Sequence, residues 1–158
     1  VTLGTFDGAN VEIVEQAGTE NNYIFGLSVD EINAKRDAYV PKTIYDYEPR
    51  VRRVVDTLID GTFSDDNSGA FSDLHRSLLF GPEWQKPDHY FVLLELMSYC
   101  ERKMQVNADY QDRMAFGRKC LMNVASAAFF SSDRTVQDYA DHIWQIKPLP
   151  PTEVRKLF

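Results

Sequence analysis

The opening of the chain alternates between apolar and polar runs in an order that predicts a strand, a helix and a second strand. Residues 1–5 form a short β-branched, apolar run typical of a buried strand, and Asp7-Gly8 is a strong turn signal. Residues 9–17 fit a helix, which Gly18 is suited to end in a left-handed conformation. Residues 23–26 predict another buried strand. This order is typical of a parallel α/β sheet, and since two strands alone are marginally stable, we expect further chain to complete it.

From Ser28 onward the apolar positions recur at helical spacing. Ser28 and Glu31 have the spacing of a capping box, which predicts a helix start. A longer helix is expected over about residues 44–59, ended by Gly61, with an inner stripe of Val51, Val54, Val55 and Leu58. After a polar loop at residues 64–69, a short helix is marked by Phe71, Leu74, Leu78 and Leu79.

The second half carries the strongest helical signals. One helix is indicated by Leu93, Leu96, Met97, Cys100 and Met104, and the next by Met114, Leu121, Met122, Ala125 and Phe129. The segment Ser131-Ser132-Asp133 suits the N-cap of a last helix, whose inward face is expected to hold Val136, Tyr139, Ala140 and Ile143. Residues 148–158 contain three prolines and predict a loose tail.

Composition and charge narrow the range of partners. The 158 residues are 44% hydrophobic and 26% charged, which suits one soluble domain. A net charge of −7 argues against nucleic acids and anionic membranes. No signal peptide and no uncharged run near the roughly 20 residues of a membrane span are visible. Cys100 and Cys120 lack metal-ligand spacing, so reduced, buried thiols and a cytoplasmic location are expected.

The densest basic group is balanced by neighbouring acids. On one continuous helix, Asp46 would pair with Arg50, and Glu48 with Arg52, at i,i+4 spacing; Arg53 and Asp56 lie close by. A solvated helix face is therefore the expected role of these charges.

Candidate chemical sites are weak throughout. The acidic loop at residues 65–69 fails as a calcium loop, because Ala70 and Arg76 stand where Gly and Glu are needed. The spacing of Gly4 and Gly8 fits no phosphate-binding motif and favours a turn with Asp7 near a helix start. The histidines are far apart, no serine sits in a nucleophile elbow, and structural or surface roles are expected for His75, His89 and His142. Core packing is favoured over a sugar site for the aromatic residues Tyr90, Phe91, Phe129, Phe130 and Trp144. The residues thus indicate a mostly helical piece without a recognisable catalytic centre.

Three segments together resemble the α-glucan (glycogen or starch) phosphorylases. Residues 4–12 read G-T-F-D-G-A-N-V-E, like the family's G-T-x-D-G-A-N-V-E, and residues 22–26 are similar to the strand that follows. Residues 130–135 read F-S-S-D-R-T, and with Tyr139 and Ile143-Trp144 they resemble the family's closing motif. The order and separations of the motifs also fit, so the resemblance spans nearly the whole chain.

The resemblance implies an α/β enzyme made of two Rossmann-like halves, as in two-domain glycosyltransferases. Such enzymes cleave α-1,4-glucans with inorganic phosphate to give glucose 1-phosphate, and they hold pyridoxal phosphate on a lysine. The family's cofactor lysine lies upstream of the first motif, whereas the first lysine here is Lys35. No catalytic, cofactor-binding or metal residue is therefore expected in this chain. The motif residues Asp7, Asn10 and Glu12 are expected to have structural roles beside the catalytic site.

The chain is therefore expected to be a cut piece, since it starts at Val1 without a methionine. Residues 1–158 would be the C-terminal portion of the cofactor-bearing domain. Residues 1–26 would end its sheet, residues 27–147 would supply packing helices, and the tail would follow. The fragment, mainly helical with two or three short strands, is expected to be inactive and without cofactor. Its partners would be the remainder of the enzyme, α-glucan and phosphate, with a homodimer as the family's usual assembly. The rival hypothesis is a free-standing helical interaction module without catalysis.

Overall fold

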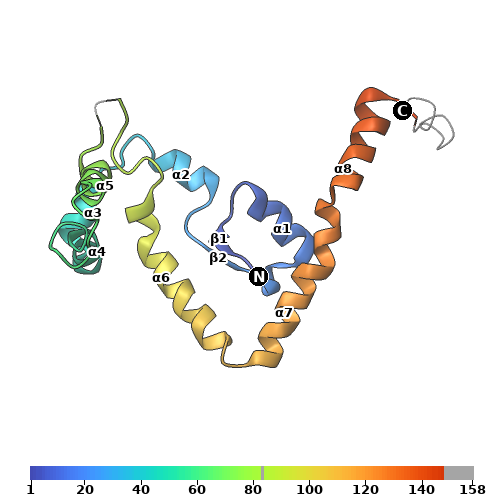
Figure 1. The fold of residues 1–158 in the computed structure, drawn as a ribbon, viewed down its shortest axis with the longest axis horizontal. Helices are drawn as coiled ribbons and strands as arrows, with labels where there is room; N and C mark the ends of the chain where they lie inside the picture. The colour runs from blue at the N-terminus through green and yellow to red at the C-terminus, as the bar shows by residue number, and fades with distance from the viewer. Residues whose placement is uncertain (83, 148–158) are drawn as a thin grey trace.

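A computed structural model describes residues 1–82 and 84–147 (Figure 1). In the order of the chain, the elements are β1 (Leu3–Thr5), α1 (Ala9–Ala17), the 3-10 turn η1 (Thr19–Asn21), β2 (Tyr23–Phe25), α2 (Val29–Lys35), α3 (Pro41–Tyr47), α4 (Pro49–Asp56), α5 (Ala70–Leu79), α6 (Val92–Asp109), α7 (Arg113–Ser126), the 3-10 turn η2 (Ala127–Phe130), α8 (Ser132–Asp138) and the π-helical turn η3 (Tyr139–Trp144). The expectation of a mainly helical chain with two short strands is confirmed for the described residues. The predicted tail at residues 148–158 lies outside them.

The predicted strand–helix–strand unit is present. β1 and β2 pair in parallel, with Leu3 opposite Tyr23 and Thr5 opposite Phe25, and α1 connects them. Gly18 ends α1 at a φ of 89°, a backbone angle that glycine adopts without steric cost. The Asn10 side chain donates to the Thr5 carbonyl (2.9 Å), so this motif residue ties the start of α1 to the end of β1.

Two long helices support this unit from different sides. α6 packs along β2, and the Tyr23 hydroxyl donates to Asp109 Oδ2 (2.7 Å) near the end of α6. α7 lies beside α1, where Ser126 Oγ donates to the Gln16 carbonyl (3.0 Å) and Asn123 Nδ2 to the Asn21 carbonyl (2.9 Å). In Figure 1, α8 continues beyond α7 as an arm, while α3, α4 and α5 gather at the opposite end of the molecule.

The hydrophobic core lies where α4, α5 and α6 meet. Its buried members are Val51 and Val55 of α4, Leu79 of α5 and Leu93 of α6. Partly buried side chains pack around them: Ile44, Tyr45, Leu78, Leu96 and Met97. The predicted apolar stripe is therefore correct at Val51 and Val55 and wrong at Val54, which is 49% exposed.

The single helix predicted over residues 44–59 is wrong, because the chain breaks between α3 and α4. Glu48 takes extended angles (φ −108°, ψ 101°) and Pro49 starts the new helix. A proline lacks the N–H that a continuing helix needs and disfavours helical angles in the residue before it. At the first turn of a helix neither property is costly, which is why Pro49 fits there.

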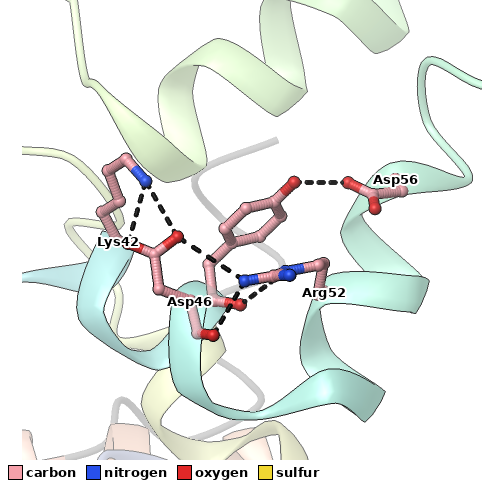
Figure 2. Close-up of polar contacts among 5 residues, drawn as sticks. Lys42, Asp46, Arg52 and Asp56 are labelled. Carbon is pink, nitrogen blue, oxygen red and sulfur yellow. Dashed lines mark hydrogen bonds and ion pairs between the residues drawn. The ribbon is translucent and has the colours of Figure 1, made fainter.

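Because of this break, the ion pairs differ from the Asp46–Arg50 and Glu48–Arg52 pairs expected for one continuous helix. Arg50 pairs with Glu48 (2.9 Å), and Arg52 approaches Asp46 (3.8 Å) instead of Glu48. Arg52 also donates from Nη2 to the Asp46 carbonyl (2.8 Å) and from Nε to the Tyr45 carbonyl (3.2 Å), so it caps the end of α3. Figure 2 shows Arg52 between the two helices, with Lys42 on the other side of Asp46. All these side chains are solvated, as expected.

The last helix does not bury the face that its periodicity predicted. Ser131 accepts from the Arg134 N–H as the expected N-cap, and Ala140 is buried. Val136 (59% exposed) and Ile143 (64% exposed) face solvent, as does Tyr139. On α7, Met114, Leu121 and Met122 are exposed as well. The apolar stripe exists, but nothing among the described residues covers it.

Candidate functional site

A cavity of about 380 Å³ opens at the carboxyl ends of the two parallel strands. Thr5 ends β1 and Asp7 follows it, while Leu27 follows β2 on the other side. The helix α2, the segment before α6 and the first turn of α6 close the remaining walls. In open α/β sheets, ligands bind in the crevice outside the carboxyl ends of the strands, so this cavity is the candidate site.

A fixed carboxylate forms one wall of the cavity. Glu95 Oε1 accepts the Leu27 N–H (2.9 Å), which fastens α6 to the residues after β2. Gly26 lies beside it with a φ of 81°, and a Cβ there would collide with the Glu95 carboxylate and approach Thr5 Cγ2 to 3.1 Å. Glycine is therefore required by both the backbone angle and the space. Asp7 also lines the cavity, and its Oδ1 accepts from the Thr5 hydroxyl (3.0 Å).

The segment before α6 is held in an unusual backbone conformation. Asp88 and Phe91 both have positive φ, 42° and 59°, a region in which non-glycine residues are uncommon and strained. Asp88 and Phe91 anchor this segment, and both are buried. Tyr90, which lies between them in the chain and lines the cavity beside His89, is 80% exposed.

Asp88 holds the segment in that backbone conformation through three hydrogen bonds. Its carboxylate accepts the N–H groups of Val92 and Leu93 (both 2.8 Å) at the start of α6. It also accepts from the Tyr39 hydroxyl (2.6 Å). Burial, reinforced by this bond to a carboxylate, raises the pKa of Tyr39 far above its ordinary value. The tyrosine thus stays neutral as a donor.

Phe91 is the second anchor. Its ring packs against the Tyr39 ring (centroids 5.1 Å apart), and the Arg36 guanidinium lies over it at 5.1 Å. This contact places Arg36, with Asn33 from the same helix, on the rim of the cavity. The cavity is therefore lined by one cationic side chain, one amide, two carboxylates and an aromatic ring, those of Arg36, Asn33, Asp7, Glu95 and Tyr90.

Of the three motif residues expected beside the site, only Asp7 lines the cavity. Asn10 turns back to the Thr5 carbonyl, and Glu12 is exposed on α1. The turn expected at Gly8 is present, with Gly8 at a φ of 47° before α1.

The aromatic residues expected in the core are also divided. Phe91 is buried as predicted, but Tyr90, Phe130 and Trp144 are exposed, so core packing is wrong for these three. Phe129 lies at the margin of exposure and stacks edge-on with Phe130. No sequence signal marked Arg36, Asn33 or Glu95 as wall residues.

The histidines are not brought together. His89 is at the cavity, His142 Nδ1 donates to the Asp138 carbonyl (3.0 Å), and the buried Nε2 of His75 has no partner among the described residues. Over residues 1–82 and 84–147, no cluster of three or more His, Cys, Asp or Glu side chains could hold a metal ion. No helix in that part of the chain is long and apolar enough to cross a membrane.

Comparisons with known proteins agree on one family. The family model for carbohydrate phosphorylases matches residues 1–146. The chain is 38% identical to the glycogen phosphorylase of Bacillus subtilis and 37% identical to that of Pasteurella multocida, over 94% of its length in each case. It is 35% identical to the brain form of human glycogen phosphorylase over 98% of its length. In all three comparisons the chain spans only 18% of the relative's own length.

Proposed function

Because the chain belongs to the carbohydrate phosphorylase family, we propose that it forms the C-terminal portion of an enzyme that cleaves α-1,4-glucans with inorganic phosphate, releasing glucose 1-phosphate. The observation that carries this proposal is the match over residues 1–146 to proteins named glycogen phosphorylases. The rival, a free-standing interaction module, is not favoured, because the match leaves no separate module outside it. We also propose the cytoplasmic location typical of the family.

The two short strands support a place in a larger sheet. β1 and β2 pair only with each other among the described residues, and each is three residues long. A parallel pair of this size is not independently stable, and parallel sheets are normally wide and covered on both faces. We therefore propose that further strands, from a Rossmann-like half shared with the rest of the enzyme, extend the sheet.

The surface of the chain supports the same completion. It exposes 11654 Å², whereas a folded monomer of 18.2 kDa is expected to expose about 8,100 Å². Much of the apolar part lies along one arm, which we call the α7–η3 face and define by Leu121, Val124, Val136, Ile143 and Trp144, all exposed. Apolar surface of this extent marks an interface, and we propose that the remainder of the phosphorylase covers it.

The cofactor implied by the family does not fit the residues of this chain. Among residues 1–82 and 84–147, no lysine lines the cavity at the strand ends. Lys42 and Lys86 are paired with Asp46 and Asp37, and Lys119 donates to the Glu20 carbonyl. We propose that pyridoxal phosphate is held elsewhere in the enzyme and that this chain alone neither binds it nor turns over glucan. A dimer, as is usual in the family, would be formed by the complete enzyme.

A chimera tests the proposed function. Residues 1–146 would replace the matching segment of the Bacillus subtilis glycogen phosphorylase, and release of glucose 1-phosphate from maltoheptaose would be measured. We expect phosphorolysis by the chimera and none by the 158-residue chain alone. A chimera that folds and binds cofactor but releases no glucose 1-phosphate would refute the proposal.

A matched variant of the chimera tests the proposed interface. Val136→Asp with Ile143→Asp changes side chains that are exposed in this chain, so the chain's own helices should be preserved. Activity of the chimera should be lost, because covering the α7–η3 face would bury two unpaired charges. Unchanged activity would show that this face stays in solvent.

A further inference from the structure

We propose that two copies of the 158-residue chain, when separate from the rest of the enzyme, pair in antiparallel orientation through their α7–η3 faces. The inference goes beyond the proposed function, in which the remainder of the phosphorylase covers this face in the complete enzyme. In the isolated chain that cover is missing, and the spacing, charge and area of the face fit a second copy.

The spacing of exposed side chains along α7 is the first argument. The side of α7 that faces α1 is marked by three polar residues that bond to the first 21 residues: Lys119, Asn123 and Ser126. The opposite side of the helix carries five exposed, small or apolar residues at intervals of three and four: Met114, Gly117, Leu121, Val124 and Ala128. Because a helix has 3.6 residues per turn, these residues form one stripe along the outside of α7 and into η2. Such spacing is typical of the seam between two paired helices.

The stripe continues along the arm that α8 and η3 form beyond α7 (Figure 1). Val136, Tyr139 and Ile143 are exposed there, again at intervals of three and four. If two arms lie antiparallel with their centres near residue 128, Leu121 faces the second copy's Val136, and Met114 faces the second copy's Ile143. Both copies then make the same contacts, as a two-fold symmetric interface requires.

The distribution of charge along the arm is the second argument, because it selects the antiparallel orientation. Residues 113–126 contain no acidic residue and three basic ones: Arg113, Arg118 and Lys119. Residues 132–144 are acidic on balance, with Asp133, Asp138 and Asp141 against Arg134. Antiparallel pairing places the basic half of each arm beside the acidic half of the other, whereas parallel pairing opposes like charges. Since each chain has a net charge of −7 and repels a second copy overall, this local attraction is needed.

The area of the exposed surface is the third argument. The chain exposes 11654 Å², and a folded monomer of its mass is expected to expose about 8,100 Å². The surplus is larger than the roughly 800 Å² that each partner contributes to a stable complex of standard size. The isolated chain therefore has enough uncovered surface for a stable pair.

Analytical ultracentrifugation of the 158-residue chain tests the pairing. We expect a species of twice 18.2 kDa whose share grows with concentration. Val136→Asp with Ile143→Asp should raise the dissociation constant of the pair by about tenfold or more, because pairing would bury unpaired carboxylates. Val40→Asp with Ile59→Asp is the matched control, since it adds the same charge at exposed apolar positions before α3 and after α4. A monomeric chain, or equally tight pairing in the two double variants, would overturn the proposal.

Crosslinking tests the orientation in a chain that carries Cys100→Ser and Cys120→Ser. A short bismaleimide reagent should join Met114→Cys chains to Ile143→Cys chains in an equimolar mixture, and join neither variant to itself. Crosslinking of Met114→Cys chains to one another would indicate parallel arms and refute the antiparallel pair.

The chimera separates this inference from the proposed function. A monomeric 158-residue chain together with an active chimera would overturn the pairing and leave the proposed function intact. Antiparallel pairing of the isolated chain together with an inactive chimera would support the pairing and refute the proposed function.

Discussion

Replacing Asp88 with alanine removes a buried carboxylate that serves three donors at once. Two of these are the first N–H groups of α6, and losing such a cap costs about 1 kcal/mol. The third is the Tyr39 hydroxyl, which would stay part-buried without a partner at a cost of about 1–3 kcal/mol. Together the free energy of unfolding should fall by about 2–4 kcal/mol. That loss is a large share of the roughly 5–15 kcal/mol typical of a domain.

The assay is urea unfolding of the 158-residue chain followed by far-UV circular dichroism. Asp73→Ala is the control, because Asp73 forms an exposed ion pair with Arg76 (3.0 Å) and such pairs contribute at most about 1 kcal/mol. Tyr39→Phe alone should cost about 1 kcal/mol. Combined with Asp88→Ala it should cost less than the sum, because no orphaned hydroxyl remains. A loss in Asp88→Ala no larger than in Asp73→Ala, or strict additivity with Tyr39→Phe, would refute this account.

Two further predictions concern β2 and its supports. Gly26→Ala should lower the midpoint of thermal unfolding, because φ is 81° and the new Cβ meets the Glu95 carboxylate. Gly117→Ala, in α7 with open space around it, should raise the midpoint by the equivalent of about 0.5–1 kcal/mol; a gain at both positions would contradict the close approach at Gly26. Burial and the bond to Asp109 raise the pKa of Tyr23 from 10 to about 12, so the stability it contributes is complete below pH 10 and is lost as pH rises towards 12. The midpoint of urea unfolding should therefore fall less steeply between pH 10 and 12 in Tyr23→Phe than in the unchanged chain. An equally steep fall in the variant would show that Tyr23 is not its source.

Local chemistry made part of the fold predictable from the sequence. The capping box of Ser28 and Glu31 closes as its spacing predicts, with Ser28 N donating to Glu31 Oε2 (2.8 Å) and Glu31 N to Ser28 Oγ (3.3 Å). The same holds for α1 between Gly8 and Gly18, because those signals act within a few residues. At Pro49, apolar periodicity over residues 44–59 conflicted with a local breaker, and the breaker prevailed.

The remainder depended on contacts between distant segments. Periodicity shows which side of the last helix is apolar, but not whether a partner for Val136 and Ile143 lies within the same chain. The candidate site was hidden for a related reason. Its walls come from β1, α2 and α6, and the positive φ angles at Asp88 and Phe91 carry no mark in the sequence, since neither residue is glycine.

The bonds between α7 and the first 26 residues have a consequence for biosynthesis. Lys119, Asn123 and Ser126 reach residues that precede them by 99, 102 and 110 positions. A ribosome adding about 5–20 residues per second needs roughly 5–20 s to deliver those partners. During that interval β1, α1 and β2 emerge without the helix that steadies them, so nascent chains paused between residues 26 and 113 should recruit chaperones more strongly than chains released after α7.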